Sequence, residues 1–298
     1  MILTVTLNPT IDKFYYLDRF KLNGLNRSVR CDTVASGKGL NVSRTLKSLG
    51  GETFATGIIA GYTGEFIINE INGLGIPNEF VRVPGETRVT ANIMEIGSPE
   101  TTEVLENGFA VTEADTERFL AVFGKRLNAM NESDFVVISG SACVGCPDDI
   151  YNVLIGTAKD RGIRTVLDTS GERLKRGVSA EPFMIKPNLN ELRYLTGINI
   201  PAEKPDAQCA PLRIVKEAAA GLVRGGTEYV CVTMGADGAV VACRDGVYRE
   251  PAERITPKRT VGCGDAFTAG FVKGLYDIMK PQECLKYAIK TATEHAIK

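Results

Sequence analysis

One carboxylate, Asp265, lies in the Gly-rich segment TVGCGDAFTAGF. Apolar residues follow it at the spacing of one helical stripe, at Phe267, Phe271, Leu275 and Ile278. A helix that begins here would gather the unpaired backbone N–H groups of residues 262–264 beside the carboxylate. Those groups could stabilise charge on a transferring group, while Asp265 accepts the proton of an attacking hydroxyl, as in phosphoryl transfer. The alternative is that Asp265 only caps the helix and complements its dipole.

A second Gly-rich segment, ASGKGLNVSRTLKSLG, contains Gly37, Lys38, Gly39 and Asn41 before another helical pattern. Glycines at the start of a helix allow a bound group to approach the backbone, and the helix N-terminus favours negative or hydroxyl-rich ligands. The segment lacks the spacing of a Walker A loop, and Val42 stands where a dinucleotide-binding fingerprint has its third glycine. A structural turn is an equally good interpretation.

A third segment, VTMGADGAVV, places Thr233, Gly235 and Gly238 after a strand-like run. Its backbone and hydroxyl could form a cradle for nucleotide phosphates. The alternative is a tight turn between two strands, which needs no ligand.

The elements that must position these segments alternate along the chain. Short runs at 135–139, 165–169, 183–188 and 229–234 predict buried strands, and amphipathic stretches at 148–161 and 212–224 predict helices. This order predicts an α/β fold with a mostly parallel central sheet and helices on both faces. Ligands bind beyond the carboxyl ends of such strands. Polar residues that follow the predicted strands are Asp12, Ser139, Ser141, Asp168, Lys186, Asn188 and Thr233.

Two regions interrupt the alternation with paired strand-like segments, at 13–20 with 28–36 and at 88–96 with 102–108. They predict a small antiparallel sheet, which is either a lid over the site or an edge of the main sheet. We therefore expect one domain over 1–298, with a discontinuous β lid at roughly 13–36 and 86–108.

Composition excludes several classes of protein. The net charge of -1 argues against nucleic-acid binding through bulk positive charge, and no apolar run is long enough to span a membrane. The N-terminus resembles a strand rather than a signal peptide, so a soluble cytoplasmic protein is expected. The only histidine, His295, leaves little room for a histidine-based mechanism.

The eight cysteines are expected to be reduced thiols. Cys143 and Cys146 form a C-x-x-C, but a second pair and a nearby histidine, which a zinc site would need, are absent from the sequence around them.

Together these segments resemble the ribokinase-like (PfkB) sugar kinases almost from end to end. GKGLN is similar to the N-terminal signature of that family and TVGCGDAFTAGF to the C-terminal one. Between them, SGS, KPNLNEL and VTMGADGA match family patterns in the same order.

The resemblance implies a role for each matched residue. Asp265 would be the catalytic base, and the N–H groups of Gly262, Cys263 and Gly264 would form the anion hole. The residues implied at the sugar are Asp12, Gly37, Lys38, Gly39, Asn41 and Ser139. The residues implied at ATP are Lys186, Asn188, Thr233, Gly235, Ala236, Asp237, Gly238 and Gly264. Glu191 would bind Mg²⁺ through water, and the lid would support a homodimer.

Within the family, TLNPTID, SGKGLNVSR and GETRV are most similar to the hexose-phosphate kinases, 1-phosphofructokinase and tagatose-6-phosphate kinase. A phosphorylated substrate needs cations at its far end, and Lys38, Arg27 and Arg88 are the candidates. Asn92 stands where 1-phosphofructokinases usually have a lysine, and TEVLENG is closer to the tagatose-6-phosphate kinases. The whole pattern still favours fructose 1-phosphate, with tagatose 6-phosphate and fructose 6-phosphate as alternatives.

Three departures from the family pattern bear on function. Cys263 replaces a small alanine, although an anion hole needs only its N–H group. SGSACVGC replaces the usual SGSLP-x-G, and TATEHAIK stops before the small-residue turn that often holds adenine. A sugar-phosphate sensor without catalysis is therefore an alternative. A nucleotide-dependent oxidoreductase is another, against which the missing dinucleotide fingerprint argues.

Overall fold

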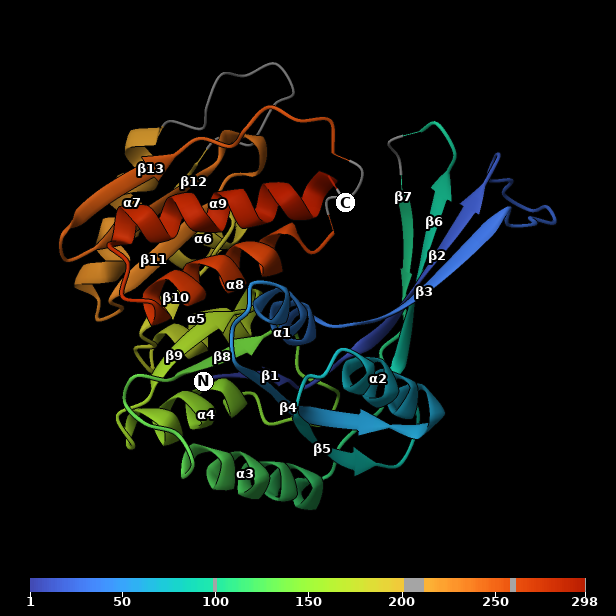
Figure 1. Ribbon diagram of the computed structural model, residues 1–298, viewed down its shortest axis with the longest axis horizontal. Coiled ribbons are helices and arrows are strands. Elements are labelled where there is room, and N and C mark those ends of the chain that lie inside the picture. Colours follow the sequence, from blue (N-terminus) through green and yellow to red (C-terminus); the bar gives the residue numbers. More distant parts are fainter. Residues whose placement is uncertain (99–100, 201–211, 258–260, 298) are drawn as a thin grey trace.

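The computed structural model describes residues 1–98, 101–200, 212–257 and 261–297 (Figure 1). These residues contain a nine-stranded sheet in the order β13-β12-β11-β10-β9-β8-β1-β4-β5. The pairings from β11 to β5 are parallel, and β12 and β13 add an antiparallel edge. The strands are β1 (Ile2–Thr6), β4 (Thr53–Ala60), β5 (Asn78–Val83), β8 (Phe135–Ser139), β9 (Arg164–Asp168), β10 (Met184–Ile185), β11 (Tyr229–Thr233), β12 (Ala239–Cys243) and β13 (Gly246–Glu250).

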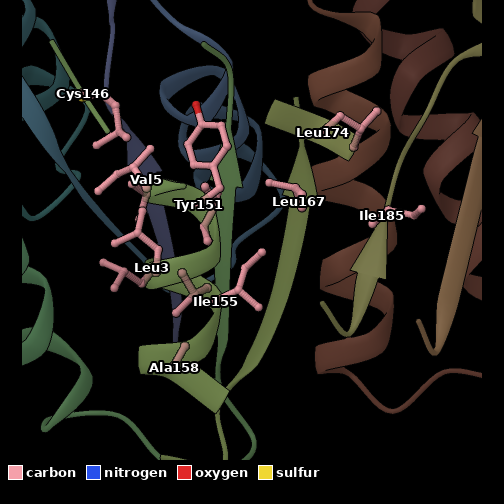
Figure 2. Close-up of a cluster of buried hydrophobic side chains, with 14 of the residues drawn as sticks. Leu3, Val5, Cys146, Tyr151, Ile155, Ala158, Leu167, Leu174 and Ile185 are labelled. Carbon is pink, nitrogen blue, oxygen red and sulfur yellow. The ribbon is translucent and has the colours of Figure 1, made fainter. Parts of the chain in front are cut away.

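Helices cover both faces of this sheet, because successive strand residues point to opposite sides. Ile2 and Val137 pack with α1, α8 and α9, whereas Leu3 and Val136 pack with α3 to α7. Figure 2 shows part of the hydrophobic core that contains Leu3, where β1 packs against α4. The helices are α1 (Lys38–Ser48), α2 (Gly61–Gly73), α3 (Glu113–Leu127), α4 (Ile150–Lys159), α5 (Gly171–Val178), α6 (Leu189–Thr196), α7 (Leu212–Arg224), α8 (Cys263–Tyr276) and α9 (Pro281–Ile297).

A second sheet of four strands, in the order β3-β2-β6-β7, extends to one side of the main body (Figure 1). Its strands are β2 (Thr10–Leu17), β3 (Arg30–Ser36), β6 (Arg88–Glu95) and β7 (Thr101–Leu105). The outer pairs are antiparallel and the central β2–β6 pair is parallel. The base of this sheet is anchored by Ile11, which packs with residues of α2.

The predicted parallel sheet with helices on both faces, and the separate small sheet, are confirmed. Two details differ. The strand expected at 183–188 shrinks to β10, after which the chain turns toward α6. Ile278 lies beyond the end of α8, with φ +61° and 92% exposure, so it does not belong to the buried stripe. Within the described ranges, no helix has the length and apolar character of a membrane span.

Candidate active site

Asp265 lies in the first turn of α8, but its carboxylate does not cap the helix. The N-cap is Gly262, whose φ of +88° suits glycine, and the helix has no side-chain capping bond there. Asp265 is 5% exposed, and its Oδ2 accepts a hydrogen bond of 2.8 Å from Asn41 Nδ2 on α1. The side chain is therefore directed across the α1–α8 junction, between the two Gly-rich segments.

The environment of Asp265 favours proton uptake near neutral pH. Burial, and next the negative charge of Asp168, raise the pKa of Asp265 to about 7. The hydrogen bond from Asn41 and the charges of Lys38 and Lys186 act in the opposite direction without cancelling the rise. A carboxylate with a pKa near the working pH is well suited to general-base catalysis.

Asp168, at the carboxyl end of β9, forms ion pairs with two lysines. Its Oδ1 accepts from Lys38 Nζ at 2.9 Å, and its Oδ2 lies 3.3 Å from Lys186 Nζ. Burial opposes ionisation of Asp168, but the two ammonium groups hold its pKa below the ordinary value. The same pairing raises the pKa of Lys38. The sequence placed Asp168 among the polar strand ends but gave it no role, since its partner Lys38 lies 130 residues away.

The N-terminus of α8 adjoins this charged group. A Cβ atom on Gly264 would lie 3.5 Å from Lys186 Nζ, which shows how close the lysine comes to the helix backbone. The first N–H groups of a helix have no intrahelical partners and carry partial positive charge. Gly262, Cys263, Gly264 and Lys186 therefore offer a site for an anion beside Asp265.

Gly37 and Gly39 allow the start of α1 to pack closely on the end of β1. A Cβ on Gly39 would lie 2.3 Å from Thr6 Oγ1, and Gly37 has φ +126°. This contact keeps Lys38 and Asn41 beside α8. The glycines therefore have a structural explanation in addition to any contact with a ligand.

Asp12 and Arg88 belong to a cluster of polar side chains on the second sheet. Asp12 is the third residue of β2, pairs in register with Thr90, and is 8% exposed. The sequence placed it at the end of the first strand, whereas the structure places it within the second sheet. Arg88 Nη2 donates to the carbonyl of Asn8 at 3.2 Å, and burial lowers the pKa of Arg88 while Asp12 opposes this.

Several buried polar atoms of this group have no hydrogen-bond partner among the described residues. They are Asn8 Oδ1, Arg88 Nε and Asn92 Nδ2. Buried polar groups are normally hydrogen-bonded, so these atoms suit a polar ligand at this place.

Ser139 and Arg27 lie in contrasting surroundings. Ser139 is 2% exposed at the end of β8, and its hydroxyl lies 3.5 Å from the carbonyl of Asp168. Arg27 is exposed on the connection between β2 and β3. Within this chain, the structure brings Ser139 to the charged cluster but leaves Arg27 outside it.

The segment from Thr233 to Gly238 forms a tight connection between β11 and β12. Gly235, Ala236 and Asp237 form a single 3₁₀ turn. Gly238 has φ +86°, and a Cβ there would lie 2.1 Å from the carbonyl oxygen of Glu250. The interpretation as a turn between strands is thus confirmed, and the turn also borders a cavity.

This cavity has a volume of about 450 Å³. Its lining is drawn from the β11–β12 turn, the segment after β13, the start of α8, and α9; it includes Gly235, Ala236, Cys263, Ile289 and Ala292. Cys263 links it to the anion site, because the same residue begins α8. Small and apolar side chains dominate, as is typical of pockets for small molecules.

Asn188 and Glu191 form the capping box of α6. Asn188 Oδ1 accepts from Glu191 N at 2.9 Å, and Glu191 Oε2 accepts from Asn188 N at 2.8 Å. Glu191 also contributes to raising the pKa of Lys38, so its charge acts on the cluster. A carboxylate has room for further acceptor contacts beside the capping bond.

His295 contributes to the site in a way that the sequence did not suggest. Its Nε2 lies 3.0 Å from the carbonyl oxygen of Val261, and a Cβ on Gly262 would lie 2.8 Å from the same nitrogen. A carbonyl can only accept, so Nε2 donates. The ring thus supports the backbone directly before the anion site from α9.

The pH dependence of stability gives a test of the buried carboxylate. The folded-state pKa of Asp265 lies above its unfolded value, so its contribution to stability is greatest below the unfolded pKa. It is lost as the pH rises from about 4 through about 7. We therefore expect Asp265→Asn to gain stability relative to the unmodified protein between pH 4 and pH 8, measured by urea unfolding. Parallel stability curves for the two proteins would contradict the raised pKa.

Comparison with known proteins adds to this geometry. The sequence profile of the pfkB family of carbohydrate kinases matches residues 5–295. A tagatose-6-phosphate kinase from Staphylococcus epidermidis is 33% identical over 290 residues, which are 97% of this chain and 89% of that protein. A possible 1-phosphofructokinase from Thermotoga maritima superposes with a TM-score of 0.85 at 28% identity, over 100% of this chain and 92% of that one. Phosphofructokinase-2 from Escherichia coli shares the fold, with a TM-score of 0.90 at 24% identity, over 99% and 93% of the chains.

Proposed function

The chain belongs to the pfkB family of carbohydrate kinases, and from this premise we propose that it transfers the γ-phosphoryl group of ATP to a ketohexose phosphate. The first candidate acceptor is fructose 1-phosphate, which would become fructose 1,6-bisphosphate. The observation that carries the proposal is the buried Asp265 carboxylate, held 2.8 Å from Asn41 beside the open N-terminus of α8.

In the proposed reaction Asp265 accepts the proton of the attacking hydroxyl. The backbone N–H groups of Gly262, Cys263 and Gly264 stabilise the charge on the transferring phosphoryl group, and Lys186 adds a positive charge beside them. Asp168 forms ion pairs with Lys186 and Lys38 and so directs both ammonium groups.

The sugar phosphate would lie between α1 and the second sheet. Asp12, Asn41 and the backbone at Gly37 and Gly39 would bind hydroxyl groups, and Ser139 would close the inner end. Lys38 and Arg88 would meet the phosphate already on the sugar, whereas Arg27, exposed on the connection between β2 and β3, lies outside this cluster within the chain. The buried polar atoms without partners around Arg88 support a polar ligand here.

ATP would place its base in the cavity of about 450 Å³ that α9 lines. Thr233, Gly235, Ala236, Asp237 and Gly238 would cradle its phosphates as the chain turns between β11 and β12. Cys263, which lies both in the cavity wall and at the start of α8, supports this path from base to γ-phosphate.

Mg²⁺ would neutralise part of the charge on the ATP phosphates. No group of three or more acidic, histidine or cysteine side chains in the described ranges is arranged to hold a metal ion. The oxygen donors at hand fit a magnesium ion that keeps its waters and binds mainly to phosphates. Glu191 would contact that water shell, with Asn188 holding Glu191 through the capping box.

Tagatose 6-phosphate is a second candidate acceptor. Asn92 is 2% exposed and belongs to the cluster of buried polar side chains on the second sheet. The lysine that 1-phosphofructokinases usually have at this position would add a positive charge to that cluster. The tagatose-6-phosphate kinase at 33% identity supports the same alternative.

A substrate panel tests the proposal. The protein would be assayed with Mg-ATP and fructose 1-phosphate, tagatose 6-phosphate or fructose 6-phosphate, with ³¹P NMR to identify the product. We expect ADP and a bisphosphate to form in equal amounts with one preferred sugar. Absence of turnover with all three would contradict the substrate class. Binding in calorimetry without transfer would instead support a sensor.

His295→Ala should weaken catalysis by loosening the anion site. The variant leaves the Val261 carbonyl without this donor, and a single hydrogen bond of this kind corresponds to about three- to tenfold in rate or affinity. We expect kcat/KM for ATP to fall by about that factor. His295→Gln keeps an N–H donor and should recover most of the loss. Activity of His295→Ala within twofold of the original would contradict this role.

We also propose that the second sheet closes over the sugar and takes part in a homodimer. Exposed apolar side chains suit such a contact: Leu22 and Leu25 on the connection between β2 and β3, and Leu105 at the end of β7. Closure would exclude water from Asp265, so ATP hydrolysis with sugar bound should stay far below transfer. Light scattering that shows a monomer at assay concentration would contradict the dimer.

A further inference from the structure

Two thiols face each other in the loop that follows β8. Cys143 and Cys146 are 1% and 7% exposed, and their Sγ atoms lie 3.3 Å apart. Bonded sulfurs lie about 2.05 Å apart, so a shift of about an ångström would join this pair. Neither thiol has a role in the proposed reaction.

The backbone holds the two thiols in this arrangement. Cys146 N donates to the carbonyl of Cys143 at 3.3 Å and closes a four-residue turn. Gly145 has φ +84°, and a Cβ there would lie 2.1 Å from the Val111 carbonyl oxygen. Val111 N in turn donates to the carbonyl of Val144 at 2.8 Å. The contacts with the backbone of Val111 therefore hold this turn in place.

The charges around the pair favour a thiolate at Cys146. Arg173 donates to the carbonyls of Pro147 at 3.1 Å and of Cys146 at 3.4 Å, so its guanidinium lies beside the turn. The hydrogen bond from the Cys143 thiol, and then Arg173, lower the pKa of Cys146. The pKa of Cys143 is raised, first through that same hydrogen bond and then by burial. A thiolate is the reactive form of cysteine.

The loop also connects the pair to the candidate active site. The carbonyl of Gly140 accepts from Tyr151 Oη and Thr169 Oγ1, each at 2.8 Å, and Gly140 N donates to the Asp168 carbonyl at 2.9 Å. Figure 2 shows Tyr151 and Cys146 in one core cluster. Gly140 precedes Cys143 by three residues and adjoins Ser139 and Asp168, so a movement of the turn at 143–146 would be passed to the site through the intervening backbone.

We propose that Cys143 and Cys146 are a reversible redox modification site, at which hydrogen peroxide forms an intrachain disulfide. The Cys146 thiolate attacks one peroxide oxygen, and the O–O bond breaks. Hydroxide departs, and Cys146 becomes a sulfenic acid. The Cys143 sulfur then attacks the Cys146 sulfur, and the sulfenic oxygen leaves as water with the released proton. Two thiols and one peroxide give one disulfide and two waters, and a dithiol reductant reverses the reaction.

The disulfide should weaken binding of the sugar phosphate more than of ATP, because the loop begins at Gly140, directly after Ser139, whereas the nucleotide cavity is lined by other segments. This kinetic consequence rests on the proposed function, but the modification itself does not. We expect KM for the sugar phosphate to rise several-fold and KM for ATP to change less than twofold.

The modification can be read directly by mass spectrometry of the full-length protein. Trypsin releases residues 127–159 as one peptide, in which Cys143 and Cys146 are the only cysteines. After peroxide treatment and alkylation in denaturant, we expect this peptide to carry no alkyl groups. Its mass should be lower by two hydrogens than that of the reduced, unalkylated peptide. Dithiothreitol should restore both alkylation sites. Full alkylation of the peptide at a peroxide concentration that oxidises the exposed Cys31 would overturn the proposal.

Variants separate this pair from Cys263, which borders the anion site. Cys143→Ser and Cys146→Ser should each abolish the lighter peptide, and Cys143→Ala/Cys146→Ala should lose the peroxide effect on the sugar-phosphate KM. Kinetics would be compared within a Cys263→Ala background, so that oxidation of Cys263 plays no part. A bridge that forms without changing this KM would overturn the link to the active site. Absence of kinase activity in every protein would instead refute the proposed function and leave the mass result intact.

Discussion

Asp265→Asn is expected to lower kcat by about 10²- to 10⁴-fold, because it removes the proposed general base while keeping the size and shape of the side chain. The amide oxygen of the new residue can still accept from Asn41 Nδ2, so α1 and α8 should stay together. Affinity for ATP should change little, since the carboxylate meets the sugar hydroxyl and not the nucleotide. Steady-state kinetics and ATP-binding calorimetry would measure the two effects.

Asp277→Asn is the matched control on the same helix. Asp277 lies at the opposite end of α8, where it pairs with Lys273. This variant makes the same chemical change without touching the site, so its kcat should stay within twofold of the original. An Asp265→Asn protein that keeps more than about a tenth of its activity would show that another group takes the proton.

Asp168→Ala is expected to reduce the free energy of unfolding by about 3–5 kcal/mol and to impair catalysis. Asp168 is fully buried and offsets the charge of Lys186, which is 4% exposed. Removing one partner leaves an uncompensated ammonium group in the interior, and Lys38 loses the acceptor that directs it. Urea unfolding and kcat per folded molecule would measure the two losses.

Asp134→Ala provides a control with a similar ion pair. Asp134 is 4% exposed and pairs with the amino group of Met1, before β8 and away from Asp265. This variant should lose stability but keep its activity per folded molecule. If Asp168→Ala were as stable as the original protein, the buried Lys186 would not need this carboxylate, and the electrostatic account of the site would be wrong.

The fold could be predicted because its signals are local. Alternation of β-branched runs with amphipathic stretches indicated the parallel sheet, and the polar paired segments indicated the second one. The parallel pairing of β2 with β6 could not be foreseen, because the strands are separated by most of the first hundred residues. Ile278 kept the helical spacing, yet the chain enters a left-handed conformation there and leaves the helix.

The parts of the candidate site that lie in Gly-rich segments could be predicted. The contacts between side chains far apart in the sequence could not. The segments around Gly39 and Asp265 stood out in the sequence, and the structure brings them together. The pairing of Lys38 with Asp168 depends on the order of strands in the sheet. His295 was noted only as a lone histidine, since its contact with Val261 depends on how α9 packs on α8.

A crystal structure of the protein with its sugar phosphate and a non-hydrolysable ATP analogue would show whether Asp265 meets the acceptor hydroxyl. We expect the acceptor hydroxyl to lie about 3 Å from the Asp265 carboxylate, in line with the γ-phosphate. We also expect this phosphate to accept from the N–H groups at the start of α8. A sugar hydroxyl placed against a different residue, with Asp265 still bonded only to Asn41, would contradict the proposed role of Asp265.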